Sequence, residues 1–326
     1  MGSDSDRARL DDAARAGWLY FVAGNTQDEI ARKLGVSRPT AQRLVSLAIS
    51  ERLVTFRLEH PIAACMALAA RLSERYGLKH CDVVPADPGS DSTTTGIAEA
   101  AAAFIEARLK AERPVIVALG TGRTLRAAVD QIPPMKCPSH QLVSLVGNIT
   151  PDGSASFYDV LSKLADLTGA RHYPMPLPAV AASPEERAQL VGLEPVRRVH
   201  ALAARADVTV VGVGQIDLKA PLLLDGFASR EEILELMRRG AVGEIASWSF
   251  DAGGNILAHG LNERITSVRL DVPAGGLRVG VAMGPAKTAA IRAALVGGLL
   301  NGLVTNEATA AALIAAEAPR GITASA

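Results

Sequence analysis

Short apolar, β-branched runs alternate with helical stretches over most of the second part of this chain. Residues 114–120 (PVIVALG) are apolar throughout and residues 206–214 (ADVTVVGVG) are mostly apolar and β-branched, while 97–110 (IAEAAAAFIEARLK) is a helical stretch. Strands without polar alternation, separated by helices, are typical of a parallel sheet that helices cover on both faces. The sequence therefore predicts an α/β domain with a mostly parallel sheet covered by helices.

The same pattern gives the expected elements of this domain. We expect strands over 81–86, 114–120, 140–147, 206–214, 264–272 and 302–306, an extended piece over 170–179, a glycine-rich hairpin over 240–257, a strand, turn and helix from residue 279, and helices over 62–77, 97–110, 124–132 and 158–169.

Glycine residues mark the ends of several of these strands. Residues 115–129 (VIVALGTGRTLRAAV) predict a strand, a tight turn at Gly120-Thr121-Gly122 and a helix that begins near Thr124. Such a turn presents backbone N–H groups and the positive end of a helix dipole, which suits an anion. Ligands of open parallel sheets bind at the carboxyl ends of the strands. The predicted pocket residues are Gly120, Thr121, Gly122, Arg123, Thr124, Gly147, Asn148, Gly214 and Gln215, with Lys287 at a further strand-to-helix turn.

The first sixty residues predict three short helices in series. In the first helix we expect Ala14, Trp18, Leu19 and Val22 to face inward. The second begins with the capping box Thr26-Gln27-Asp28-Glu29, and the third begins after Gly35 with Ser37 as its N-cap. A helix, a short glycine turn and a second helix form the helix-turn-helix motif, whose last helix enters the major groove of DNA. Residues 53–58 (LVTFRL) alternate like the strand of a wing.

Local charge favours this interpretation over three helices of an ordinary packed domain. Between residues 15 and 57, seven basic residues face three acidic ones, a net charge of 7 − 3 = +4, whereas the whole chain is neutral with 34 of each sign. Arginine and glutamine side chains on the outer face of the third helix can reach base edges and phosphates. The predicted DNA-contacting residues are Thr26, Gln27, Ser37, Arg38, Thr40, Gln42 and Arg43.

Length and composition fit a two-domain protein in a reducing compartment. With 326 residues the chain is long enough for a small domain over 1–59 and a larger one over 60–326. Its three cysteines follow no metal or redox spacing, the first residues are unlike a signal peptide, and no apolar stretch reaches membrane-spanning length. We therefore expect a cytoplasmic protein without a metal ion or cofactor.

No catalytic set of residues stands out. The six histidines are scattered, and GTGRTL is neither a Walker loop nor a dinucleotide-binding fingerprint. An isomerase or deaminase would need a general base, for which only Asp217 and Glu244 are candidates, neither in a recognisable motif. A DNA-bound scaffold with a vestigial pocket is a third alternative.

The chain resembles the SorC-type sugar-binding transcriptional regulators of bacteria over nearly its whole length. The resembling segments are TQDEIARKLGVSRPTAQRLV, ALGTGRTL, SLVGNI, MPLPAV, DVTVVGVG, GAVGEI, AKTAAIRAAL and LVTNEATA, in that order. The effector domain of this family is related in fold to ribose-5-phosphate isomerase and glucosamine-6-phosphate deaminase.

The resemblance implies a role for each candidate pocket residue. The turn from Gly120 to Thr124 is similar to the family's phosphate cradle, with Lys287 as its counter-charge. The pairs Gly147-Asn148 and Gly214-Gln215 look like walls for sugar hydroxyls, and Asp251 is a further hydroxyl-binding candidate. Pro285 stands where relatives often have a second glycine, and it removes one backbone N–H from the anion site. An unphosphorylated sugar or polyol therefore remains an alternative ligand.

The predicted function is therefore a DNA-binding regulator of a carbohydrate or polyol operon. Its partners would be operator DNA and a sugar, polyol or sugar phosphate effector. The resemblance also implies a homo-oligomer, a tetramer made of two dimers.

Overall fold

The computed structural model describes residues 4–51, 53–54, 62–150, 153–154, 158–258, 260–270 and 276–316. The chain divides into two compact units, Met1–His60 and Pro61–Ala326. The division falls one residue beyond the boundary expected from the sequence.

The first unit consists of α1 (Asp4–Phe21), α2 (Gln27–Leu34) and α3 (Arg38–Ser50). The Oγ1 of Thr26 accepts the N–H of Glu29, whose carboxylate accepts the N–H of Thr26 at 2.8 Å, so the predicted capping box is present. Gly35 ends α2 with φ 66°, and the Ser37 hydroxyl caps α3 by accepting the N–H of Thr40. The two helices and the turn of the predicted motif are confirmed.

The inner face of α1 differs from the prediction. Trp18 and Val22, expected to face inward, are 56% and 68% exposed, while Ala13 and Ala16 are fully buried. The reason is the close approach of α3, because a Cβ on Gly17 would lie 2.8 Å from the Cβ of Ala48 and small residues must therefore face it. The expected wing strand over 53–58 lies, apart from residues 53 and 54, outside the described residues.

The core of this first unit is small. Its buried members are Ala16, Ile30, Ala31, Ala41 and Val45, with Leu19, Phe21, Leu34, Val36 and Leu44 packed against them.

The second unit is built on a seven-stranded sheet in the order β1-β10-β9-β5-β2-β3-β4. Every neighbouring pair in this sheet is parallel, as the apolar runs predicted. The strands are β1 (His80–Val84), β2 (Ile116–Leu119), β3 (Gln141–Ser144), β4 (Arg171–Tyr173), β5 (Val208–Gly212), β9 (Leu277–Val281) and β10 (Gly302–Asn306).

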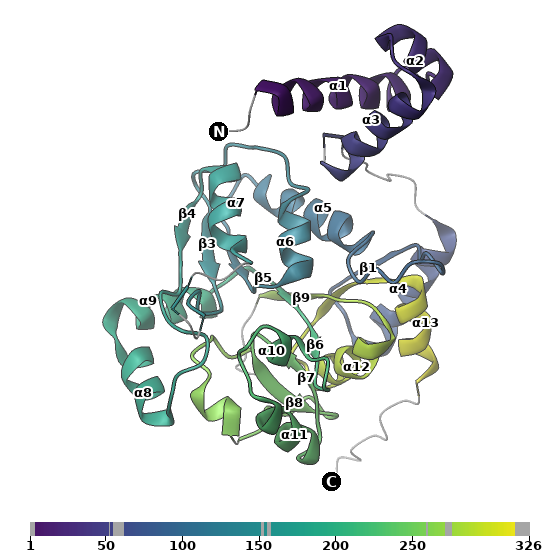
Figure 1. The fold of residues 1–326 in the computed structure, drawn as a ribbon. Coiled ribbons are helices and arrows are strands. Elements are labelled where there is room, and N and C mark those ends of the chain that lie inside the picture. Colours follow the sequence, from purple (N-terminus) through teal and green to yellow (C-terminus); the bar gives the residue numbers. More distant parts are fainter. Residues whose placement is uncertain are drawn as a thin grey trace. The chain divides into compact units, whose positions relative to one another are not determined.

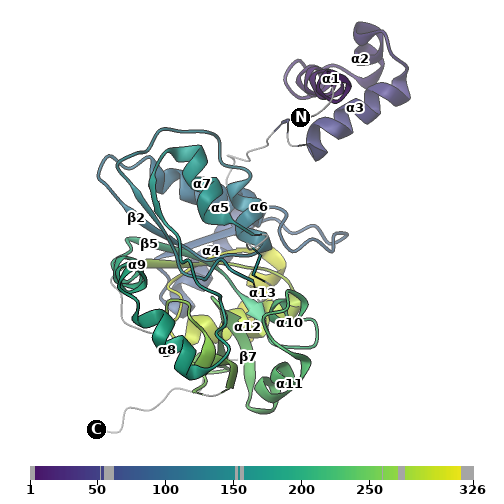
Figure 2. The same cartoon turned by 60° about the vertical axis from the view of Figure 1, so that its left-hand side comes forward.

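Helices cover both faces of this sheet, as Figures 1 and 2 show for the second unit. On one face, Val117 and Leu119 of β2 pack with α5 (Ile97–Leu109), α6 (Arg123–Val129) and α7 (Val160–Thr168). On the other, Ala118 packs in a cluster that includes α4 (Ala63–Tyr76), α9 (Glu194–Ala204), α12 (Thr288–Val296) and α13 (Glu307–Ala315). Successive strand residues point to opposite faces, so both faces of β2 are apolar because both are covered.

A second, three-stranded antiparallel sheet adjoins the large one. It contains β6 (Gly214–Gln215), β7 (Ala241–Ile245) and β8 (Trp248–Asp251), and β7 and β8 form the predicted hairpin. The helices α10 (Pro221–Leu224) and α11 (Arg230–Arg238) and the 3₁₀ helix η1 (Gly260–Arg264) pack around a separate apolar cluster centred on Ile233 and Leu261. Another 3₁₀ helix, η2 (Pro285–Lys287), precedes α12.

Two parts of the sequence prediction were incomplete or wrong. The strand expected over 264–272 is absent from the described residues of that segment, where Ile265 makes only an isolated bridge to Val180 and the N–H of Val268 bonds to the carbonyl of Leu145. The helices α8 (Pro184–Gly192), α9, α10 and α11 were not predicted.

Candidate ligand-binding site

A cavity of about 280 Å³ opens where the carboxyl ends of β2 and β5 meet the small antiparallel sheet. Its wall includes the first turn of α6, the start of β6, the β7–β8 hairpin loop, α10 and the end of η2. The predicted residues that line it are Gly120, Thr121, Gly122, Arg123, Thr124, Gly214, Gln215 and Lys287. The sequence therefore located most of one wall of this cavity.

The glycine turn before α6 has the backbone shape that the pattern predicted. Gly122 has φ 117° and ψ 172°, a region that is essentially restricted to glycine. The first N–H groups of α6 lack intrahelical acceptors and remain available to a ligand. The N–H of Gly120 is not available to a ligand, because it donates to the carbonyl of Val210 at 2.9 Å.

Lys287 follows a second turn of the same kind. Gly284 has φ 108° and ψ 153°, and its N–H donates to Oγ1 of Thr309 at 2.9 Å, so it is not free for an anion. Burial lowers the pKa of the Lys287 ammonium, while the nearby carboxylate of Glu244 acts in the opposite direction.

Arg123 forms one side of the cavity mouth. Its Nη2 lies 2.6 Å from Oδ1 of Asp225, and its guanidinium lies 5.2 Å from the centre of the Tyr158 ring. Both partners also line the cavity. The guanidinium is thus held between a carboxylate from the residue after α10 and an aromatic face.

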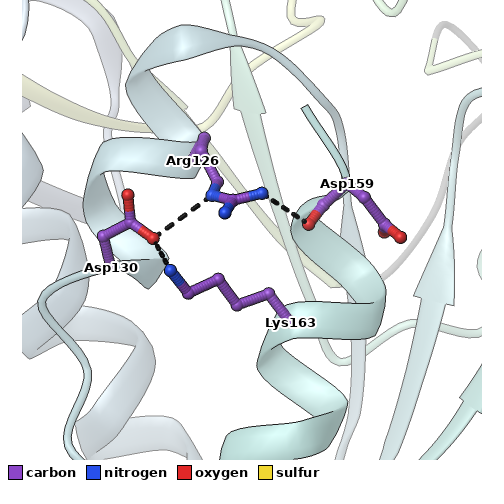
Figure 3. Close-up of polar contacts among 4 residues, drawn as sticks. All are labelled: Arg126, Asp130, Asp159 and Lys163. Atoms are coloured by element: carbon purple, nitrogen blue, oxygen red, sulfur yellow. Dashed lines mark hydrogen bonds and ion pairs between the residues drawn. The ribbon is translucent and has the colours of Figure 1, made fainter. Parts of the chain in front are cut away.

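A polar network holds Asp159, the residue before α7, against α6 (Figure 3). The carboxylate of Asp130 pairs with Nε of Arg126 at 3.2 Å and with the ammonium of Lys163 on α7. Arg126 also donates to the carbonyl of Asp159 at 3.5 Å. Since the Thr121 hydroxyl donates to the carbonyl of Tyr158 at 2.7 Å, the segment before α7 is bonded to the glycine turn at one point and to α6 at another.

Glu244 brings a second carboxylate to the cavity wall. Its Oε2 accepts the N–H of Ser247 at 2.9 Å, across the two-residue turn of the β7–β8 hairpin. A Cβ on Gly214 would lie 2.2 Å from Oε1 of Glu244, so a larger residue at position 214 would require this carboxylate to move from its present place. Burial raises the pKa of the Glu244 carboxyl above its ordinary value.

The hairpin turn itself is strained. Ala246 and Ser247 have φ 51° and 69°, left-handed values that both central positions of a type I′ turn require and that asparagine and glycine meet more easily. Both residues line the cavity. Non-glycine residues with such backbone angles are concentrated at ligand sites.

Gly147 and Asn148 lie beside this cavity rather than in it. They line a smaller adjoining hollow of about 30 Å³, which shares Gly120, Thr121 and Tyr158 with the main cavity. Gly147 is needed for close packing, because a Cβ there would lie 2.4 Å from the carbonyl oxygen of Leu177.

Asp251 is placed elsewhere and does not line either hollow. Its Oδ1 accepts the N–H groups of Gly253 and Asn255, each at 2.9 Å, and thereby closes the loop after β8. The predicted hydroxyl contact of Asp251 stays a prediction, and neither hollow supports it, because Asp251 lines neither of them and its Oδ1 is engaged in a local turn.

Of the two candidate general bases, Glu244 and Asp217, only one lies at the cavity. Glu244 lines the cavity, whereas Asp217 does not and accepts the N–H of Lys219 at 2.7 Å. Residues that the sequence analysis did not select also line the cavity, among them Thr93, Tyr158, Lys219, Asp225 and Phe227. No spacing pattern marks them, because they come from loops and helix ends.

The titration of Glu244 gives a testable consequence for stability. Its folded pKa lies above the ordinary 4.5, so its stabilising contribution is present below that pH and is lost as the pH rises through the folded pKa. We expect Glu244→Gln to gain in free energy of unfolding relative to the wild type as the pH rises from about 4.5, by at most about 1.4 kcal/mol per pH unit. Thermal unfolding of both proteins across this range measures the difference.

Glu194→Gln is the matched control for this comparison. Hydrogen bonds from Arg197 and Arg198 lower the pKa of Glu194, so this variant should show the opposite trend, with the wild type losing its advantage as the pH falls. A pH-independent difference between Glu244→Gln and the wild type would contradict the expected shift.

The predicted DNA-contacting residues all lie around α2 and α3. Arg38, Gln42 and Arg43 are exposed on α3, and Arg38 pairs with Asp28 at 3.5 Å. Thr26 and Ser37 use their hydroxyls to cap the two helices, and Oγ1 of Thr40 contacts Ser37 and accepts from Arg43 at 3.2 Å. Gln27 is half-buried at the start of α2. The long exposed polar side chains of α3 are therefore those of Gln42 and of the two arginines, each of which also contacts a neighbouring side chain.

The two remaining features concern metal-binding clusters and membrane-spanning helices in the described residues. Within the described ranges, no group of three or more His, Cys, Asp or Glu side chains is placed to hold a metal ion. No helix among the same residues is both long and apolar enough to cross a membrane.

Comparison with known proteins identifies the family. Residues 60–315 match the family described as "Putative sugar-binding domain", which covers the cavity and all of the large sheet. The chain belongs to this sugar-binding domain family.

Individual relatives extend the match of this family member to the first unit. It is 34% identical to the erythritol catabolism regulatory protein EryD of Brucella abortus over 93% of this chain and 96% of that one. It is 31% identical to the transcriptional regulator LsrR of an Enterobacter strain, over 93% and 92%. Both are named as regulators, in agreement with the predicted regulator and against the isomerase or deaminase alternative.

The fold agrees with a solved regulator of the SorC type. The full-length sorbitol operon regulator SorC of Klebsiella pneumoniae superposes with a TM-score of 0.68, at 24% identity, over 94% of this chain and 99% of that one. The predicted fold class, a helical first unit followed by a largely parallel α/β domain, is thereby confirmed.

Proposed function

We propose that this chain regulates an operon for carbohydrate or polyol catabolism, and that a sugar, polyol or sugar phosphate in the cavity controls its binding to operator DNA. The observation that carries the proposal is the cavity itself, where the Gly122 turn, Lys287 and Glu244 converge at the carboxyl ends of parallel strands. A helix-turn-helix with exposed basic residues in the same chain supplies the DNA-binding part. The name of the Brucella relative, which refers to erythritol catabolism, supports this class of ligand.

The proposed mechanism is a shift between states of different DNA affinity. A ligand changes such an equilibrium only by its differential affinity for the two states. Two-fold symmetry in a dimer would place two helix-turn-helix units on half-sites one or more helical turns apart. We propose that the functional assembly, acting in the cytoplasm, is a tetramer of two such dimers.

A direct test is a titration of the full-length protein onto DNA from upstream of its own gene. Fluorescence anisotropy at two salt concentrations, with and without a panel of sugars, polyols and their phosphates, should show binding that falls steeply with salt and responds to at least one ligand. Absence of DNA binding at both salt concentrations would contradict the proposed function. Turnover of a sugar phosphate that Glu244→Gln abolishes would instead favour the enzyme alternative.

Arg43 gives a residue-level test of the DNA interface. We expect Arg43→Ala to weaken operator binding by about 1–3 kcal/mol, because an arginine on the recognition helix contacts either a guanine or a phosphate. The salt dependence of the affinity distinguishes the two contacts, since loss of a phosphate contact lowers the salt slope by about one. Arg9→Ala, an exposed arginine on α1, is the matched control and should leave the affinity unchanged.

A further inference from the structure

Charged groups of both signs surround the cavity. Arg123, Lys219 and Lys287 are its cations, and Asp225 and Glu244 are its carboxylates. The carboxylates face the same space as the glycine turn that would hold an anion. An anionic ligand in this cavity would therefore meet two negative groups as well as the cations.

Asp225 forms an ion pair with Arg123, one of the cations that could otherwise bind an anionic ligand. Its Oδ1 lies 2.6 Å from Nη2 of Arg123, the first residue of α6 and the cation next to the Gly122 turn. Ion pairing between groups this close compensates both charges. The arginine best placed to hold a phosphate on the turn is already neutralised by the protein.

The backbone around Asp225 holds this carboxylate in place. The N–H of Asp225 donates to the carbonyl of Pro221 at 2.9 Å, and Gly226 follows with φ 77°. Leu222, one turn earlier in α10, is buried, and its carbonyl accepts the N–H of Phe227 at 2.9 Å. Moving Asp225 away from Arg123 would require this packed turn to rearrange.

Buried acceptors at the cavity call for hydrogen-bond donors on the ligand. Oε1 of Gln215, which lines the cavity, and Oδ1 of Asn148, which lines the adjoining hollow, are buried and have no hydrogen-bond partner among the described residues. Glu244 adds a carboxylate that can only accept once it is ionised. Hydroxyl groups supply the donors that these oxygens lack, whereas a phosphate dianion in the place of one of these hydroxyls would supply acceptors only.

We propose that the ligand is an uncharged polyhydroxylated molecule, and that Asp225 is the residue that disfavours its phosphate ester by neutralising Arg123. This inference rests on the proposed function, in which the cavity binds a carbohydrate-like effector. The inference selects the uncharged sugars and polyols over the sugar phosphates, a choice that the fold alone does not make.

Inorganic phosphate and a set of polyols test this assignment. Isothermal titration of the full-length wild type with erythritol, xylitol and sorbitol, with the monophosphate of each, and with inorganic phosphate should show that an uncharged polyol binds at least tenfold more tightly than its phosphate. In Asp225→Asn, which keeps the shape of the side chain but frees Arg123, the affinity for inorganic phosphate should rise at least tenfold.

Two control variants isolate the ion pair. Adding Arg123→Met to Asp225→Asn should abolish the gain in phosphate affinity, because the freed guanidinium is its source. Glu194→Gln also frees arginine side chains, those of Arg197 and Arg198 on α9, but away from the cavity, and it should leave phosphate affinity at the wild-type level. Melting curves of each variant show that it is folded.

Failure of this inference can be told apart from failure of the proposed function. If the wild type binds a sugar or polyol phosphate more tightly than the parent polyol, or if folded Asp225→Asn gains no phosphate affinity, the inference is wrong while ligand-dependent DNA binding stands. Loss of DNA binding in the wild type overturns the proposed function itself.

Discussion

Replacing Gly122 with alanine is expected to shift the response of DNA binding to much higher ligand concentrations while leaving the ligand-free affinity for DNA unchanged. Gly122 has φ 117° and ψ 172°, angles that an alanine reaches only at a cost of about 1–3 kcal/mol. The backbone will change its angles instead, and the N–H groups of Arg123 and Thr124 will turn away from the cavity. A cost of this size corresponds to a loss of about ten- to hundredfold in ligand affinity.

The origin of this effect is conformational rather than steric. A Cβ on Gly122 would meet no atom within 4 Å, so there is room for the methyl group. Gly192, near the end of α8, also has open space around a Cβ but has no positive φ, and Gly192→Ala is the matched control. Anisotropy titrations of DNA, repeated over a range of ligand concentrations, measure both affinities. Equal ligand response in Gly122→Ala and the wild type would show that the turn does not hold the ligand.

The parallel sheet could be predicted because each of its buried strands is marked by a short apolar run in the sequence. Val117 and Leu119 face one layer of helices and Ala118 the other, so the run from 115 to 119 is apolar without alternation. The glycines at the ends of β2 and β5 then located one wall of the cavity, since parallel strands end at the same edge.

The opposite wall depends on tertiary contacts that leave no periodic pattern. Asp225 follows a four-residue helix, and its partner Arg123 is 102 positions away in the chain. The small sheet and α11 form a separate apolar cluster. The hairpin of this sheet was predicted, but α11 was missed although Ser229 and Glu232 form a capping box at its start. The residue to which we assign ligand selection, Asp225, is therefore one that no sequence pattern indicated.

Trp18 shows how a local argument fails, whereas the predicted ligand contact of Asp251 stays a prediction that the cavity does not support. Asp251 follows an aromatic residue in a glycine-rich loop, a reasonable place for a ligand contact, but the loop's own N–H groups use its carboxylate. Trp18 fits a helical period, yet Gly17 is the position where α3 approaches, and the larger side chain turns outward. The helix that approaches Gly17 is distant in sequence and could not be inferred from the spacing of residue types, whereas the partners of Asp251 lie only two and four residues along the chain.

The small core of the first unit leads to the second large effect. Ile30 is fully buried and packs in a cluster with Ala16, Ala31, Ala41 and Val45. Truncation of a buried isoleucine to alanine costs about 2–5 kcal/mol, and a unit of about sixty residues has little stability beyond that. We expect Ile30→Ala to unfold the helix-turn-helix and to abolish DNA binding.

The second unit should survive this change because it has its own cores. Residues of Pro61–Ala326 form apolar clusters separate from that of Ile30, so ligand binding by Ile30→Ala should match the wild type when measured by calorimetry. Val22→Ala, at a position that is 68% exposed, is the control and should retain both activities. Loss of ligand binding together with DNA binding in Ile30→Ala would mean that the two units fold as one cooperative system. Retention of ligand binding alone would show that the sugar-binding unit folds independently and that the helix-turn-helix is the part that contacts DNA.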